Sequence, residues 1–245
     1  MSASPSPVFD AGCSRCARLS DFLAQVRAEH PDYYARPVPP FGDPQARLLI
    51  VGLAPGMHGA NRTGRPFTGD FAGILLYRTL YEFGFASQPE SLSADDGLVL
   101  KRCRITNAVK CLPPQNKPVG AEIKSCNAFL RAELATVPAG GLVLALGKIA
   151  HDAVLRSVAA PLARNRFAHG AEHDHQHGCG RDPPQRVDAH AQHHRCHEER
   201  RDRAVRGQRP HRREAPCRGR PDQLDTELVV HGQSRDGLDG RRRHE

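Results

Sequence analysis

Short apolar runs alternate with amphipathic segments along the first part of the chain. Three runs have the length and composition of buried strands, at 47–53, 99–109 and 141–147. Apolar residues at helical spacing mark four further segments, at 15–30, 70–85, 118–134 and 148–158. Strands that alternate with helices in this way predict an α/β fold, layered around a mostly parallel sheet.

Two polar loops, 54–70 and 107–118, follow the carboxyl ends of the first two predicted strands, where ligands bind in sheets of this kind. The first loop is rich in glycine, which allows a backbone to approach a ligand closely. Its polar and aromatic residues include His58, Asn61, Arg62, Arg65, Phe67 and Asp70. A ring, cations, an amide and a carboxylate together suit a flipped base and its phosphates. The alternative is a plain surface loop.

Composition divides the chain after residue 170. Every Phe and Tyr lies at or before Phe167, and the last 75 residues hold only seven large aliphatic side chains. Such a segment buries too little apolar surface to offset its chain entropy. We therefore expect a folded domain at 1–173, incomplete at its C-terminal end, and a low-complexity Arg/His-rich tail at 174–245. We expect this tail to be disordered, or to result from a frameshift in GC-rich DNA.

Charge and cysteine usage narrow the class further. The formal net charge of +8 is compatible with an anionic partner. No run of about 18 apolar residues and no secretory signal is present, so we expect a cytoplasmic protein without a membrane span. Its cysteines are then reduced thiols or metal ligands. Four thiolates hold zinc or an iron–sulfur cluster, and the alternative is a set of buried thiols. Cys103 alternates with apolar residues in a predicted strand and is interpreted as a core residue.

Four segments occur in the order typical of one family of DNA repair enzymes. They are GLAPGMHGANRTGRPFTGD (52–70), ITNAVKCLPPQNKP (105–118), LALGKIAHDA (144–153) and FAHGAEH (167–173). With them the chain resembles the family 5 uracil-DNA glycosylases, which are iron–sulfur enzymes with relaxed base choice. Leu53 favours family 5, because the related family 4 enzymes carry Glu at this position.

The resemblance covers the chain from about Cys13 to His173. It implies a three-layer α/β sandwich with a mostly parallel central sheet, like that of the uracil-DNA glycosylases. It also implies a [4Fe–4S] cluster bound by Cys13, Cys16, Cys111 and Cys126. Because hydrolysis needs no electron transfer, we interpret the cluster as a clasp between two distant parts of the chain.

The resemblance also assigns the residues of a base site. Phe67 would stack on the extruded base, and the Asn107 amide would read the edge of the base. Asp70 would position or deprotonate the attacking water and stabilise the positive charge that develops on the sugar. Further residues expected to contact the substrate are Gly52, Arg62 and Arg65, with Lys110 and Lys117 as additional candidates for phosphate contacts.

The implied activity is hydrolysis of the N-glycosidic bond of uracil, and of other deaminated bases, in DNA. This is the first step of base excision repair, and we expect a monomer to perform it. The family's third motif, a His-Pro-Ser run followed by Asn, is missing after His173, so we expect weak activity or low stability. The alternatives are a non-catalytic iron–sulfur module that binds nucleic acid, and a four-cysteine zinc protein unrelated to repair.

Overall fold

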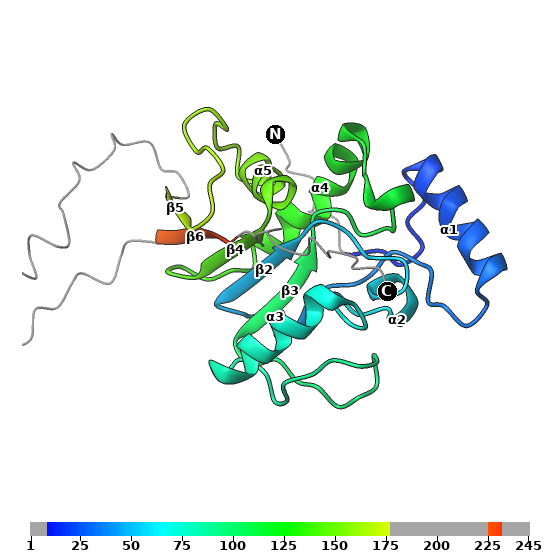
Figure 1. The fold of residues 1–245 in the computed structure, drawn as a ribbon. Helices are drawn as coiled ribbons and strands as arrows, with labels where there is room; N and C mark the ends of the chain where they lie inside the picture. Colours follow the sequence, from blue (N-terminus) through cyan, green and yellow to red (C-terminus); the bar gives the residue numbers. More distant parts are fainter. Residues whose placement is uncertain (1–8, 177–224, 232–245) are drawn as a thin grey trace, which may run out of the picture. The chain divides into compact units, whose positions relative to one another are not determined.

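The computed structural model describes residues 9–176 and the strand 225–231, with its elements labelled in Figure 1. The described strands form one six-stranded sheet in the order β1-β3-β2-β4-β6-β5. Its centre consists of β2 (Leu48–Gly52), β3 (Cys103–Asn107) and β4 (Leu142–Leu146), which are mutually parallel. The short β1 (Phe41–Gly42) pairs antiparallel with β3. These central strands confirm the predicted α/β class.

The other edge of the sheet is built by the end of the domain and by a strand from the tail. β6 (Asp225–His231) pairs parallel with β4, and β5 (Ala171–Gln176) pairs antiparallel with β6. β6 differs from our expectation, because we predicted no folded element there. It contains the tail's one run of three large aliphatic residues, 228–230. The rest of the tail, including the range where the third motif would stand, lies outside the described residues.

Helices cover both faces of the sheet, which gives three layers (Figure 1). α1 (Ala17–Glu29), α4 (Gly120–Leu134) and α5 (Lys148–Ser157) contribute to the core on one face. α3 (Phe71–Glu82) contributes to the core on the other face. The single-turn α2 (Ala60–Thr63) lies within the glycine-rich loop. Among the described helices, none combines the length and apolar character that a bilayer crossing requires.

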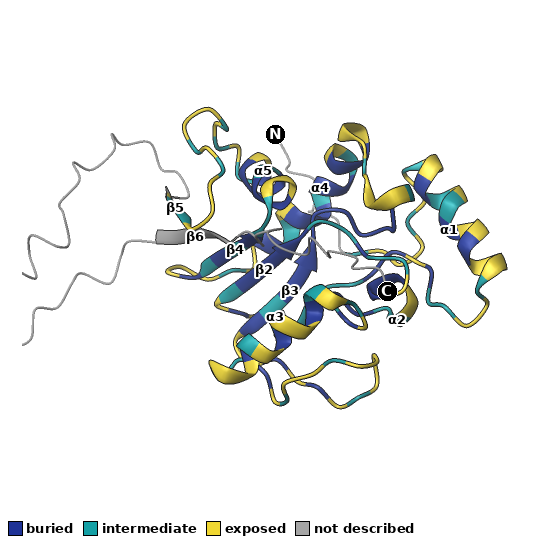
Figure 2. Ribbon diagram, viewed as in Figure 1, coloured by how far each residue is buried: buried dark blue, intermediate teal, exposed yellow. Residues whose placement is uncertain are grey.

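The side chains of β2 alternate between the two cores. Leu49 and Val51 belong to the core beneath α1, α4 and α5, whereas Ile50 packs with Tyr77 of α3. This alternation follows from the two-residue period of a strand, and Figure 2 shows the central strands as a largely buried layer. Cys103 is fully buried in the second core, as predicted. The glycine-rich loop begins directly after β2, so the packing of β2 fixes where the loop starts.

Candidate active site at the carboxyl edge of the sheet

The carboxyl ends of β2 and β3 bring an aromatic ring and an amide to the same place. Gly52 and Asn107 end these strands and are paired in register. A methyl group on Gly52 would lie 2.5 Å from Asn107 Oδ1 and 2.6 Å from Phe67 Cζ. Ring and amide therefore both border the Gly52 backbone, which only a residue without a side chain allows. Three predicted site residues, from two of the segments that carry the resemblance, meet here.

The Asn107 amide is buried but not fully satisfied. Its residue is 4% exposed, and its Oδ1 has no hydrogen-bond partner among the residues that the structure describes. Leaving a buried acceptor unpaired costs roughly 1–3 kcal/mol, because the group has lost its contact with water. Unpaired buried acceptors are rare in folded proteins. A hydrogen bond from the N–H group of a ligand would offset the cost of burying this one.

Asp70 occupies the start of α3. Its Oδ1 accepts a hydrogen bond of 2.8 Å from Gly73 N and thereby caps the helix. Its Oδ2 faces the turn before α2, since a methyl group on Gly59 would lie 2.6 Å from it. A carboxylate at this position interacts favourably with the positive end of the helix dipole. One carboxylate thus serves the fold through one oxygen and presents the other toward the loop.

The two arginines of the loop have different environments. Arg62 is exposed, and its Nε donates to His58 O at 2.8 Å. The Arg65 side chain is 6% exposed, and its Nη1 lies 2.6 Å from Asp96 Oδ1. The Arg65 guanidinium therefore lies inside the protein, which differs from the predicted contact with the substrate.

Lys110 differs from its predicted role in the same way. Its Nζ is buried, lies 2.8 Å from Glu133 Oε1 and donates to Thr106 Oγ1. Lys117, by contrast, is exposed. Of the four candidate cations, Arg62 and Lys117 thus have accessible side chains. The local sequence could not separate the two kinds, because the carboxylates that pair with Arg65 and Lys110 come from distant segments.

All four predicted cysteine ligands line one cavity. Cys13 and Cys16 precede α1, Cys111 follows β3, and Cys126 lies on α4. Cys126 Sγ accepts a hydrogen bond of 3.3 Å from Lys110 N. The described cysteines are free thiols, with no disulfide among them. The chain thus gathers soft sulfur ligands from three segments that are far apart in sequence.

The electrostatics of this cavity oppose bare thiolates. Burial, followed by the neighbouring thiols, raises the pKa of Cys111 to about 12. Burial also raises the pKa of Cys126. Four sulfurs would ionise together only next to a compensating positive charge. Within residues 9–176 no group of three or more His, Cys, Asp or Glu side chains has the arrangement to hold a single metal ion.

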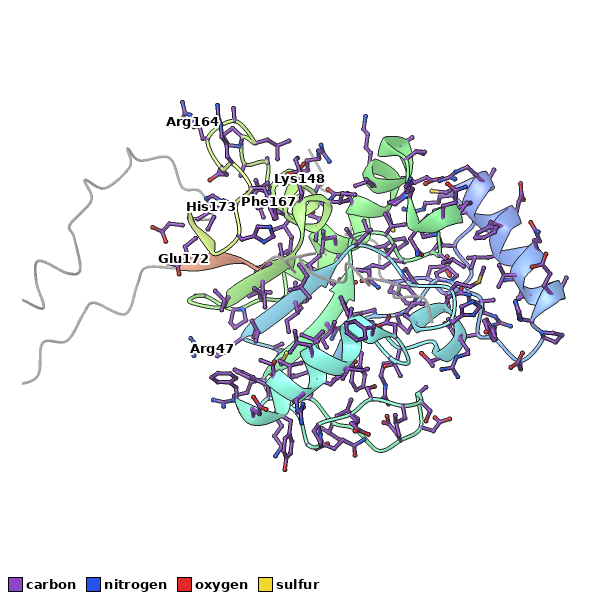
Figure 3. All side chains as sticks on the ribbon, in the orientation of Figure 1. Arg47, Lys148, Arg164, Phe167, Glu172 and His173 are labelled. Atoms are coloured by element: carbon purple, nitrogen blue, oxygen red, sulfur yellow. The ribbon has the colours of Figure 1, made fainter. Side chains whose placement is uncertain are left out.

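A histidine pair joins the last two segments that carry the resemblance. The rings of His151 on α5 and His173 on β5 have centroids 5.3 Å apart, and Phe167 packs on His151. Phe167 and His173 are labelled in Figure 3. Burial, and then His151, lower the pKa of His173. His151 Nδ1 lies 3.0 Å from Asp152 Oδ1, which orients its ring. This ring contact joins α5 to β5.

Two residues near the base site were not predicted from the sequence. A methyl group on Gly73 would collide with the Phe67 carbonyl oxygen, so α3 passes the stacking loop without room for a side chain. Asp96 binds Arg65 from a loop 31 residues away. A glycine inside an amphipathic helix was a signal for the first. Asp96 gave no local signal, because its partner is set by the fold.

Comparison with known proteins places the chain in a family. The chain belongs to the uracil DNA glycosylase superfamily, whose family model matches residues 39–195. Its relatives include the type-5 uracil-DNA glycosylase of Thermus thermophilus, 46% identical over 166 residues, or 66% of this chain and 75% of the relative. That of Pyrobaculum aerophilum is 45% identical over 162 residues, or 64% and 70%. The type-4 uracil-DNA glycosylase of Sulfurisphaera tokodaii is 37% identical over 98 residues, or 40% and 38%. The resemblance to family 5 is confirmed.

Proposed function

We propose that this chain hydrolyses the N-glycosidic bond of uracil, and of other deaminated bases, in DNA. The observation that carries this proposal is the buried, unpaired Asn107 Oδ1 beside the Phe67 ring at the Gly52 backbone. A flat ring and an amide acceptor at a strand end suit an extruded base better than they suit the sugar or the phosphate of DNA. Hydrolysis of this bond begins base excision repair.

The two side chains would divide the recognition of the base between them. Stacking on Phe67 supplies roughly 1–3 kcal/mol and is tolerant of base identity. Asn107 Oδ1 would accept from N3–H of uracil, and its amide nitrogen would donate to the O4 carbonyl. The acceptor that is unpaired in the structure would thus gain a partner only when a base with an N–H at this edge enters.

Asp70 would act on the sugar side of the scissile bond. Departure of the base leaves positive charge on the deoxyribose, which a nearby carboxylate stabilises. The same carboxylate orients the attacking water and accepts a proton from it. The capping bond to Gly73 N holds the side chain in one orientation, so the position of Oδ2 is fixed before DNA binds.

We propose further that Cys13, Cys16, Cys111 and Cys126 bind a [4Fe–4S] cluster. Each cysteine of such a cluster binds a separate iron, so the four sulfurs surround a volume and do not converge on one ion. A cavity lined by four thiols fits this requirement. When bound, the cluster supplies positive charge that keeps the sulfurs as thiolates. The residues that hold it join α1 to α4 and to the end of β3.

We propose that the protein acts as a monomer, on DNA, in the cytoplasm. Free thiols at all five described cysteines suit a reducing compartment. Exposed Arg62 and Lys117 are suitable contacts for DNA phosphates. The absence of the third motif from the printed sequence leads us to expect turnover about 10²- to 10³-fold below that of a relative that carries it.

Replacement of Asp70 by Asn tests the catalytic proposal. Asn caps a helix as well as Asp does, so we expect the melting temperature and the affinity for uracil-containing DNA to remain. We expect release of uracil from a labelled oligonucleotide under single-turnover conditions to fall by about 10²- to 10⁴-fold. Asp43→Asn is the matched control, since Asp43 Oδ1 also accepts a backbone hydrogen bond, from Gln45 N at 2.8 Å.

Two results would contradict the proposal. Equal rates for Asp70→Asn and the unmodified chain would remove Asp70 from the chemistry. Tight binding of uracil-containing DNA by the unmodified chain, with no release of base, would favour the alternative of a non-catalytic binding module.

A further inference from the structure

The Phe67 backbone adopts a conformation that needs support from its surroundings. Its φ of 54° lies in the left-handed region, which bulky residues rarely occupy. Its carbonyl oxygen fills the space left by the missing side chain of Gly73. A conformation of this kind persists only when neighbouring contacts over-determine it. The question is therefore which contacts hold the ring against Gly52.

The residues on both sides of Phe67 are anchored by hydrogen bonds. Tyr77 Oη on α3 donates to Pro66 O at 2.8 Å. Thr68 Oγ1 lies 2.7 Å from Ser91 Oγ, within hydrogen-bond distance. Tyr77 and Thr68 are both fully buried. The peptide that carries the ring is thus fixed from α3 on one side and from the loop 88–98 on the other.

Arg65 ties the glycine-rich loop to the loop 88–98 with its charge. Its Nη1 donates to Asp96 Oδ1 at 2.6 Å and to Ser91 Oγ at 3.1 Å, and its Nη2 donates to the Ala94 carbonyl. The guanidinium also lies 4.3 Å above the centre of the Phe41 ring in β1. Through Ser91, this network reaches Thr68, the residue directly after the stacking ring.

Asp96 is itself held in place by the backbone around it. Its Oδ2 accepts from Leu92 N at 2.8 Å and from Ser93 N at 3.3 Å, and its Oδ1 accepts from Leu98 N at 3.0 Å. These bonds fold the loop around a single carboxylate. The Asp96 side chain is 11% exposed and that of Arg65 is 6% exposed. If one of the two charges were removed, little water could therefore solvate the other.

We propose that Arg65 and Asp96 are positioning residues that hold the Phe67 ring in register with Gly52 and Asn107 for stacking on the base. The stacking role of the ring rests on the proposed function, whereas the placement of the ring does not. Neither residue borders Gly52, so both act through the loop. Arg65, predicted to bind phosphate, thus contributes to recognition from inside the protein.

The first test measures the placement of the ring without any activity. Because Phe67 is in contact with Gly52, its ring current shifts the Gly52 α-proton resonances, and Phe67→Leu gives the value without the ring. We expect these resonances in Asp96→Asn to move toward the Phe67→Leu values. Ser91→Ala removes the link to Thr68 without leaving a buried charge, and we expect a smaller movement in the same direction. Glu82→Gln, an exposed residue of the same α3, is the control without change.

The second test is a double-mutant cycle on uracil release. Misplacement of a stacking group lowers the rate without unfolding the protein, so we expect Asp96→Asn to slow single-turnover release by about tenfold. In a Phe67→Ala background the same change has no ring to misplace, and its effect should stay within about twofold. A merely structural role would slow release equally in both backgrounds.

The outcomes of the two tests separate the proposals. Gly52 resonances that stay at their original positions in folded Asp96→Asn and Ser91→Ala overturn the positioning role. If Asp96→Asn does not fold, Ser91→Ala alone decides in the same way. If the unmodified chain releases no uracil, the proposed function fails, while the Gly52 resonances still confirm or overturn the role of Arg65 and Asp96.

Discussion

The base site and the cysteine cavity are both built from distant segments, but they are stabilised in opposite ways. At the base site the charges of Arg65 and Asp96 satisfy each other, while Asn107 Oδ1 and both side-chain polar atoms of Asn61 have no hydrogen-bond partner among the described residues. At the cavity, burial raises the pKa of Cys111 and of Cys126, although a hydrogen bond and the positive charge of Lys110 act to lower that of Cys126. The charges of the first site are thus paired within the protein, whereas at the second the proposed cluster would supply the compensating positive charge.

The two sites are also connected, because β3 leads into both. Asn107 is the last residue of this strand, and Cys111 follows only four residues later. The backbone between them is bound on either side, since Val109 N donates to Leu53 O at 3.0 Å and Lys110 N donates to Cys126 Sγ. The cavity and the base site are therefore joined by a short, hydrogen-bonded segment.

Removal of one cavity thiol should have the largest effect. We expect Cys111→Ala to lose most of its iron and sulfide, and to unfold at a lower urea concentration, because three thiols cannot complete the proposed cluster. Cys103→Ala is the matched control: burial also raises the pKa of Cys103 to about 12, but this residue lies in the core on the other face of the sheet. Elemental analysis and visible absorbance of anaerobically purified protein measure the difference. Full iron content in Cys111→Ala would contradict the cluster assignment.

The central part of the fold could be predicted from the sequence, and the edges could not. Apolar runs located β2 and β4 within a residue or two, because a buried strand needs such a run. The run 99–109 was too long, since only Cys103–Asn107 pairs in the sheet. β1 has two residues and gives no pattern at all. β6 depends on the free edge of β4, which no local pattern reports.

The site divides in a similar way. Phe67 and Asn107 could be named in advance because the segments that contain them resemble motifs of the family 5 uracil-DNA glycosylases. The burial of Arg65 could not be predicted. An arginine in a polar loop has the same local pattern whether its guanidinium binds a DNA phosphate or a carboxylate inside the protein. Its partner Asp96 becomes visible only once the fold brings the loop 88–98 beside it.

A methyl group at the strand end tests how complete the base site is. In Gly52→Ala, the new Cβ would lie 2.5 Å from Asn107 Oδ1 and 2.6 Å from Phe67 Cζ, so ring and amide must both move. We expect single-turnover uracil release to fall by about 10²-fold, the cost of misplacing a reacting group by an ångström, with iron content unchanged. Gly120→Ala at the start of α4 is the control, because a methyl group there meets open space. An unaffected rate in Gly52→Ala would mean that the base binds elsewhere.

Acid should expose the smallest difference between the two regions, through the ion pair of the base site. Burial alone would raise the pKa of Asp96, but hydrogen bonds from Arg65 and from the backbone of the loop lower it from 3.8 to about 2. The ionised form is thus favoured in the folded state, and this stabilisation is present above pH 3.8 and is lost as the pH falls toward 2. It amounts to about 2 kcal/mol in the free energy of unfolding.

Asp96→Asn lacks the titrating group, so the free energies of unfolding of the two proteins, measured in urea, should converge by this amount as the pH falls from 4 to 2. Cluster loss in acid affects both proteins and cancels in the difference. Parallel curves over this range would show that Asp96 titrates alike in the folded and unfolded chains, and the base site would then lack the internal charge pairing that separates it from the cavity.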